Sequence, residues 1–165
     1  MVREHISTRD RPSRRARQNG LRALDALDRR TLALLQRNAR LSNAEIGRRI
    51  GLSGPAVAQR VARLEQTGVV GGYRALLDPR AIGFGVVAFV SLKETRADSE
   101  VVAALEKMPE IVECNRVVGP RGFFLKVAAR DVSHLDNLLS EIARYGKPSS
   151  AVLLSTPFTR GFPLS

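Results

Sequence analysis

The spacing of the apolar residues changes near residue 85, and this change constrains the fold more than any other feature of the chain. Before it, apolar side chains recur every three or four residues, as on one face of an α-helix. After it, short runs rich in β-branched residues alternate with helical stretches. A chain of 165 residues can hold one large core or two small ones. We therefore expect an α+β protein with two small domains of different architecture.

Three helical patterns follow one another closely between residues 24 and 76. Each starts after a residue whose side chain can accept a hydrogen bond from the first turn, and these caps are Asp25, Ser42 and Ser53. The first cap forms a variant capping box with Asp28, and the second forms a capping box with Glu45. Gly51 ends the second helix. A short helix, a glycine-containing turn and a longer helix predict a helix-turn-helix, which we place in residues 21–70.

The positive charge of the chain is concentrated in the same half. Residues 1–80 hold 17 arginines, no lysine and 7 acidic residues, a net charge of +10, whereas residues 81–165 carry only +1. This imbalance indicates a polyanionic partner, for which double-stranded DNA is the first candidate and an anionic membrane surface the alternative. The arginines flank a helix-turn-helix, and no basic helix with a large apolar face accompanies them, so we expect DNA and no membrane.

Polar and small residues of the second and third predicted helices lie off the apolar stripe and can face DNA. In a helix-turn-helix the start of the last helix reads base edges, where small residues allow close approach, glutamine can pair with adenine and arginine can reach guanine or phosphate. The predicted contact residues are Ser42, Asn43, Arg48, Arg49, Ser53, Gly54, Pro55, Ala56, Gln59, Arg60 and Arg63. For Arg60 and Arg63 the alternative is solvated surface, or an ion pair with Glu65 or a neighbouring acid.

Residues 1–20 contain six arginines and few apolar side chains. Such a segment cannot bury enough apolar surface to offset its conformational entropy, so it predicts a disordered tail. Two interpretations remain open for it: a basic arm that follows DNA phosphates or enters a minor groove, and a solvated leader without a role.

After residue 85 the predicted elements follow the order strand, helix, strand, strand, helix, strand. The strands are expected at residues 86–92, 111–118, 123–129 and 151–155. The helices are expected to start after Asp98 or Ser99 and after Asp131 or Ser133. This order is that of a ferredoxin-like βαββαβ domain, which we assign to residues 85–165. Apolar residues on both sides of the strands favour a partner on the face without helices, most simply a second copy.

Enzymatic interpretations find little support in the sequence. The segment from Gly83 to Ala88 has the spacing of a dinucleotide-binding loop, but it leads into a predicted strand rather than into a helix. Cys114 and His134 could act as nucleophile and base, yet nothing places them together. Two histidines and one cysteine leave little for a metal site. We expect no catalysis, cofactor or metal, and the lone cysteine is consistent with a cytoplasmic protein.

Several motifs, in order and spacing, resemble the Lrp/AsnC (feast/famine) family of transcriptional regulators. The resemblance covers about residues 24–157, and its motifs are LD…DRRTLALLQ from Leu24, RLSNAEI from Arg40, GLS from Gly51, RVARLE from Arg60 and GYRALLDP from Gly72. It implies a DNA-binding domain of the winged helix-turn-helix type, a linker strand within residues 71–84 and a C-terminal effector-binding and oligomerisation domain. It further implies dimers that assemble into tetramers, octamers or larger forms, with an amino acid bound near the loop between the second and third strands of that domain.

The expected effector loop departs from the family's pattern. Many relatives carry an acid just before an aromatic residue there, whereas this chain has Gly119, Pro120, Arg121 and Gly122 before Phe123. An acid would pair with an effector's ammonium group. Gly122 cannot form such a pair, and Arg121 would repel the ammonium group. Three interpretations stay open: an amino-acid effector, a related small metabolite whose carboxylate meets Arg121, and an effector-free loop with Arg121 at an exposed tip.

These observations together predict a sequence-specific, DNA-binding transcriptional regulator, cytoplasmic and associated with the nucleoid, whose activity responds to an amino acid or a related metabolite. The alternative is a nucleoid-associated architectural protein that binds DNA broadly and has no effector.

Overall fold

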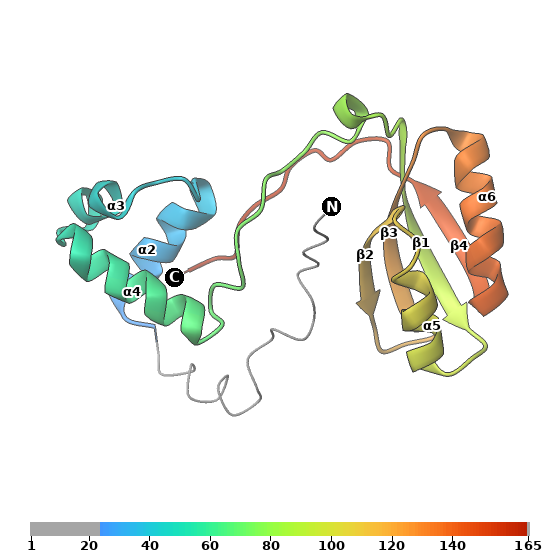
Figure 1. Cartoon of the computed structure of the whole chain (residues 1–165), viewed down its shortest axis with the longest axis horizontal. Coiled ribbons are helices and arrows are strands. Elements are labelled where there is room, and N and C mark those ends of the chain that lie inside the picture. The colour runs from blue at the N-terminus through green and yellow to red at the C-terminus, as the bar shows by residue number, and fades with distance from the viewer. Residues whose placement is uncertain (1–23, 165) are drawn as a thin grey trace. The chain divides into compact units, whose positions relative to one another are not determined.

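The computed structural model describes residues 24–164 and divides them into a helical unit and a sheet unit (Figure 1). The helical unit contains the described residues up to Ala75, and the sheet unit spans Leu76–Phe158. Residues from Thr159 onward, expected to belong to the second domain, group with the helical unit. The predicted basic tail, residues 1–20, lies outside the described residues.

The helical unit consists of three helices whose starting points agree with the predicted caps. The helices are α2 Ala26–Arg37, α3 Asn43–Ile50 and α4 Gly54–Gln66. The side chains of Asp25, Ser42 and Ser53 each accept a backbone hydrogen bond from the first turn, and the first two complete a capping box. Gly51 ends α3 with a φ of 79°, a left-handed conformation that glycine adopts without a steric penalty.

The core of this unit lies where α3 and α4 meet α2. Ile46, Ile50 and Val57 are buried, and leucines of α2 pack against them. The turn between α3 and α4 is tight, because the Leu52 N–H donates to the Gly47 carbonyl at 2.9 Å. A Cβ atom at Gly47 would overlap the carbonyl oxygen of Leu52, so this position requires glycine. These contacts fix the angle between the two helices.

The structure differs from prediction in the connection between the two units. Residues 71–84 were expected to contain a linker strand, and the helix-turn-helix was expected to carry a wing. Among the described residues no strand occurs before residue 86, and the connection contains only a short 3₁₀ turn, Arg80–Ile82. The physical reason is that a strand needs a neighbour for its backbone groups, and no strand of the described chain pairs with this segment.

The sheet unit has the βαββαβ order predicted for it. Its elements are β1 Val86–Glu94, α5 Asp98–Leu105, β2 Ile111–Arg116, β3 Phe123–Ala129, α6 Val132–Ile142 and β4 Gly146–Val152. The sheet is antiparallel with the strand order β2-β3-β1-β4, as in a ferredoxin-like domain (Figure 1). The segment from Gly83 enters β1, so the arrangement that a dinucleotide loop requires is not formed.

The two helices of this unit bury one face of the sheet. The shared core contains Ala88, Val90, Leu92, Phe123, Leu125 and Val127 from the strands, with Val101, Leu105, Leu135, Leu138 and Ile142 from the helices. On the strands' other side, Phe89 and Phe124 keep 46% and 45% of their surface exposed. A second copy on this face stays a prediction.

Four boundaries differ from those predicted. β1 continues to Glu94 instead of ending at residue 92. β4 occupies Gly146–Val152 rather than residues 151–155, because an edge strand needs no apolar alternation and tolerates Pro148. β2 ends at Arg116 instead of continuing to residue 118. Helix α5 is preceded by Ala97, and Asp98 lies in its first turn, where it forms an ion pair with Arg116 instead of capping the helix. The cap predicted at Asp131 is confirmed.

Replacing Gly47 with alanine should destabilise the helical unit. The added Cβ would overlap the Leu52 carbonyl oxygen, and overpacking of this kind costs about 1–3 kcal/mol. The matched control is Gly54→Ala, whose Cβ would rest 3.6 Å from Ala44, an ordinary contact distance. Thermal unfolding should show a lower Tm for Gly47→Ala only, and equal Tm values would contradict the packing of this turn.

Candidate DNA-binding interface

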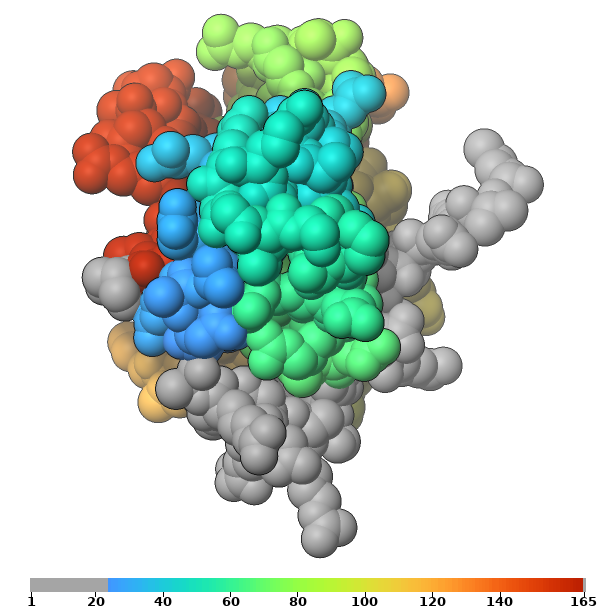
Figure 2. Space-filling model, turned by 90° about the vertical axis from the view of Figure 1, so that its left-hand side faces the viewer, coloured from blue at the N-terminus to red at the C-terminus, as the bar shows by residue number. Residues whose placement is uncertain are grey.

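The predicted contact residues of α3 and α4 lie on the surface of one helical unit, which Figure 2 shows from the side of these two helices. Most of them are exposed: Ser42, Asn43, Arg48, Arg49, Ser53, Pro55, Gln59 and Arg63. Gly54, Ala56 and Arg60 are half-buried. Exposure alone does not test a contact with DNA, so the role of each of these residues as a DNA contact stays a prediction.

The first turn of α4 has the properties of a surface that approaches DNA closely. Its residues are small, its cap is the Ser53 hydroxyl, which accepts from the Ala56 N–H at 3.4 Å, and it contains no acidic residue. The positive end of the helix dipole is therefore not neutralised by the helix's own first turn. One turn further on, Gln59 is exposed, and its amide is free to donate and accept.

The start of α3 is less open than expected. Glu45 accepts hydrogen bonds from the Ser42 N–H at 2.8 Å and from the Ser42 hydroxyl at 2.7 Å. The bonds from the Ser42 hydroxyl and backbone hold the pKa of Glu45 below its ordinary value, so an ionised carboxylate sits at this helix N-terminus. That carboxylate competes with a DNA phosphate for the N-terminus of α3. Of the two contacts predicted here, Asn43 is exposed and is not bonded to Glu45, whereas Ser42 is.

Arg60 and Arg63 reach back from α4 to α2 instead of pointing freely outward. The buried carboxylate of Asp28, with only 2% of its surface exposed, accepts from Arg60 at 2.5 Å and from Arg63 at 2.6 Å. Asp25 accepts a further bond from Arg60 at 2.6 Å. The alternative of an ion pair with a neighbouring acid therefore describes both arginines, although Glu65 is not that acid, since it accepts from the Tyr73 hydroxyl.

Charge assistance strengthens this network. The Asp28 backbone N–H and the Arg60 guanidinium hold the pKa of Asp25 below its ordinary value of 3.8. Hydrogen bonds to Asp25 and Asp28 raise the pKa of Arg60. Because the folded pKa of Asp25 is lowered, its ionised form stabilises the fold above the ordinary value, and this contribution is lost as pH falls through the lowered one. Sequence reasoning saw Asp28 only as a helix cap, because its arginine partners lie more than 30 residues away.

An acid that sequence reasoning missed lies beside the predicted effector loop. The Glu94 carboxylate, at the end of β1, accepts from the Gly122 N–H at 3.1 Å and lies where a Cβ at Gly122 would stand. Arg121 donates to the Lys147 carbonyl at 3.2 Å and is half-buried, so it is not a free hairpin tip. Glu94 is 28 residues from Gly122, and only strand pairing brings the two together.

The residues weighed for catalysis have other partners. The Arg130 N–H donates to Nδ1 of His134, and Nε2 of His134 lies 3.3 Å from Glu110. Burial raises the pKa of the Cys114 thiol, which lowers the fraction of reactive thiolate. Within residues 24–164 no group of His, Cys, Asp and Glu side chains could hold a metal ion. No helix of this described part is long and apolar enough to span a bilayer.

Asp28→Asn should loosen α4 from α2. An amide cannot offset the charge of Arg60, whose side chain is only 17% exposed, so we expect a loss of about 2–3 kcal/mol in the free energy of unfolding. Chemical denaturation of the full chain measures this, with exposed Asp136→Asn as the matched control. Equal stability of Asp28→Asn and wild type would show that the network contributes nothing.

Comparison with known proteins extends over both units. The model of the AsnC-type helix-turn-helix domain matches residues 24–65, and that of the Lrp/AsnC ligand binding domain matches residues 86–161. The chain is 38% identical over 122 residues to the leucine-responsive regulatory protein of Salmonella typhimurium, covering 72% of this chain and 74% of that protein. It is 34% identical over 133 residues to the HTH-type transcriptional regulator YezC of Bacillus subtilis, covering 81% of this chain and 95% of that protein.

Solved structures agree with this result. The structure of LrpC from B. subtilis matches with a TM-score of 0.78 at 28% identity, over 83% of this chain and 99% of that one. The feast or famine regulatory protein from M. tuberculosis, complexed with L-methionine, matches with a TM-score of 0.81 at 32% identity, over 87% of this chain and 100% of that one. Both domain types, in the same order, therefore show that this chain belongs to the Lrp/AsnC family of transcriptional regulators and carries that family's ligand-binding domain.

Proposed function

We propose that this regulator binds specific sequences of double-stranded DNA through α4, with α3 contacting the backbone. The observation that carries the proposal is the acid-free first turn of α4, where Ser53 and Pro55 are exposed and Gly54 and Ala56 half-buried, followed by the exposed amide of Gln59. Ala56 can contact a thymine methyl group, and Gln59 can pair with an adenine edge. Exposed Arg48 and Arg49 at the end of α3 add charge for phosphates.

Arg60 has a different role in this proposal. Its guanidinium holds α4 against Asp25 and Asp28, so it positions the reading surface instead of reading a base. Arg63 keeps 53% of its side chain exposed while it donates to Asp28, and its remaining N–H groups are available to a phosphate. Specificity then depends on the small residues and the glutamine of α4.

Members of this family are oligomeric, and we propose a homodimer as the basic unit, with assembly into tetramers, octamers or larger forms. Support comes from Phe89 and Phe124, exposed on the sheet face opposite the helices. A two-fold dimer would present two α4 helices to half-sites about 34 Å apart, or a multiple of that spacing. We propose that it acts at the nucleoid, where the DNA is, and without catalysis.

Gln59→Ala should change which DNA sequence is preferred, whereas Arg48→Ala should weaken binding to all sequences. Loss of a paired base contact costs about 1–3 kcal/mol at one position, and loss of one phosphate contact lowers the salt slope of binding by about 1. Fluorescence anisotropy with a selected site and with random DNA, at several salt concentrations, separates the two effects. Exposed Arg130→Ala in the sheet unit is the control. Equal wild-type affinity for all sequences would favour the architectural alternative.

We also propose that the effector is a small amino acid bound at the loop from Gly119 to Gly122. The Glu94 carboxylate beside Gly122 is placed to meet an ammonium group. The guanidinium of Arg121 uses one N–H on the Lys147 carbonyl and has others for a carboxylate. The M. tuberculosis relative with bound L-methionine supports this ligand class.

Glu94→Gln should weaken amino-acid binding about 10- to 100-fold, because a charged hydrogen bond of about 1.5–3 kcal/mol is lost. Calorimetric titration with L-methionine measures the effect, and Glu106→Gln, exposed on the same unit, is the control. The 2-keto acid with the same side chain has no ammonium group, so its binding should not respond to Glu94→Gln. An unchanged affinity for L-methionine would show that Glu94 does not read an ammonium group.

A further inference from the structure

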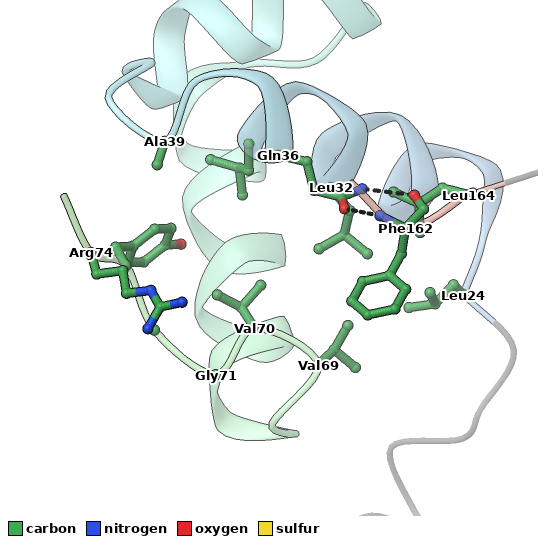
Figure 3. A pocket seen from close by; sticks show the side chains of 13 residues that line it. Leu24, Leu32, Gln36, Ala39, Val69, Val70, Gly71, Arg74, Phe162 and Leu164 are labelled. Atoms are coloured by element: carbon green, nitrogen blue, oxygen red, sulfur yellow. Dashed lines mark hydrogen bonds between the residues drawn. The ribbon is translucent and has the colours of Figure 1, made fainter. Parts of the chain in front are cut away.

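The last residues of the chain return to the helical unit and are held there by one side chain. Nε2 of Gln36, near the end of α2, donates to the Phe162 carbonyl at 3.1 Å, and Oε1 accepts from the Phe162 N–H at 2.6 Å (Figure 3). The amide thus satisfies both backbone groups of one residue 126 positions away. These two hydrogen bonds hold the backbone of Phe162 and do not depend on where its side chain lies.

The tail is shaped for this approach. A Cβ atom at Gly161 would overlap the side-chain amide of Gln36, so only glycine allows the amide to lie across the backbone here. The space at Gly161 and the hydrogen bonds of Phe162 both follow from the position of the Gln36 amide. Both residues of the contact are exposed, so burial of the pair does not force it.

Beside this contact the helical unit has an apolar cavity of about 370 Å³ (Figure 3). Leu24, Leu32 and Leu35 line it together with Val69, and Phe162 and Leu164 of the tail border it. Leu164 is half-buried, whereas Phe162 keeps 85% of its surface exposed. The backbone of the tail is therefore hydrogen-bonded to Gln36, the side chain of Leu164 is partly covered, and that of Phe162 stays largely exposed at the edge of the cavity.

We propose that this surface of the helical unit, formed by Gln36 and the cavity beside it, is a docking site for the chain's own C-terminal segment, residues 159–164. The chain leaves the helical unit after Ala75, builds the sheet unit and returns at Thr159. Docking therefore joins the two units by two tethers instead of one. Nine residues separate the end of β4 at Val152 from Phe162, so the Cα atoms of these two residues can be at most about 36 Å apart.

A second tether restricts the positions that the helical unit can adopt relative to the sheet unit. If α4 binds DNA as proposed above, this restriction lowers the entropic cost of placing α4 at correctly spaced half-sites. The docking itself does not depend on DNA binding and can be measured without DNA.

Hydrogen–deuterium exchange of the full chain tests the docking. Gln36→Ala and Gly161→Ala should each make the C-terminal peptide exchange at least several-fold faster, the first by removing the hydrogen bonds and the second by pushing the amide away. Gln36→Glu keeps an acceptor for the Phe162 N–H but faces the Phe162 carbonyl with an oxygen, so its exchange should also rise. Gln66→Ala, exposed on α4, is the control. Equal exchange in wild type and Gln36→Ala overturns the proposal.

A mixed assembly distinguishes the chain's own tail from that of a second copy. Co-expressed Gln36→Ala and Gly161→Ala chains combine one intact tail with one intact docking site, located on different chains. If docking occurs within one chain, the intact tail stays unprotected in the mixture, and restored protection overturns the assignment to the same chain.

DNA affinity gives a separate measurement. Gln36→Ala should bind a selected site about three- to tenfold more weakly than Gln66→Ala, because the second tether is lost. If wild type binds no DNA, the proposed function fails while the exchange result for the docking still stands. If Gln36→Ala exchanges faster but binds DNA as tightly as Gln66→Ala, the proposed effect of docking on DNA binding by α4 is wrong, and the docking itself is still supported.

Discussion

A buried carboxylate, that of Asp28, holds the DNA-binding unit in its working arrangement. It sits on α2 and accepts hydrogen bonds from both arginines of α4, so it links the two helices by charge as well as by apolar packing. A buried carboxylate without these partners would be costly, and so would a half-buried Arg60 without Asp28. Each side of the network requires the other, and together they orient the first turn of α4, on which the proposed base contacts depend.

The same use of distant partners recurs at the other sites. Glu94 restores a carboxylate to a loop whose own residues lack one, and it does so because β1 and β3 are paired. Gln36 binds the backbone of a residue close to the C-terminus. In each case a polar side chain satisfies a backbone group or a charge from another part of the chain. The DNA surface, the effector loop and the tail contact are therefore all tertiary constructions built on locally predictable elements.

Local rules predicted the elements well where a short-range interaction decides them. The capping boxes at Asp25 and Ser42 and the left-handed Gly51 involve neighbours within four residues, and the structure confirms them. Prediction was wrong where a distant neighbour decides. β4 starts at Gly146 because β1 offers it a pairing edge, and residues 71–84 form no strand because no described strand lies beside them. Asp98 pairs with Arg116 on β2 instead of capping α5.

The sequence by itself determined the class of each unit, the helix-turn-helix and the ferredoxin-like order of elements, since periodicity and capping depend on near neighbours. It also determined which residues of α3 and α4 can face outward. Only the tertiary structure decided which of them are free. It directs Arg60 to Asp25 and Asp28, places Glu94 beside Gly122 and seats Phe162 on Gln36. The reason is that hydrogen bonds and ion pairs act over about 3 Å, and the partners are 28 to 126 residues apart in the chain.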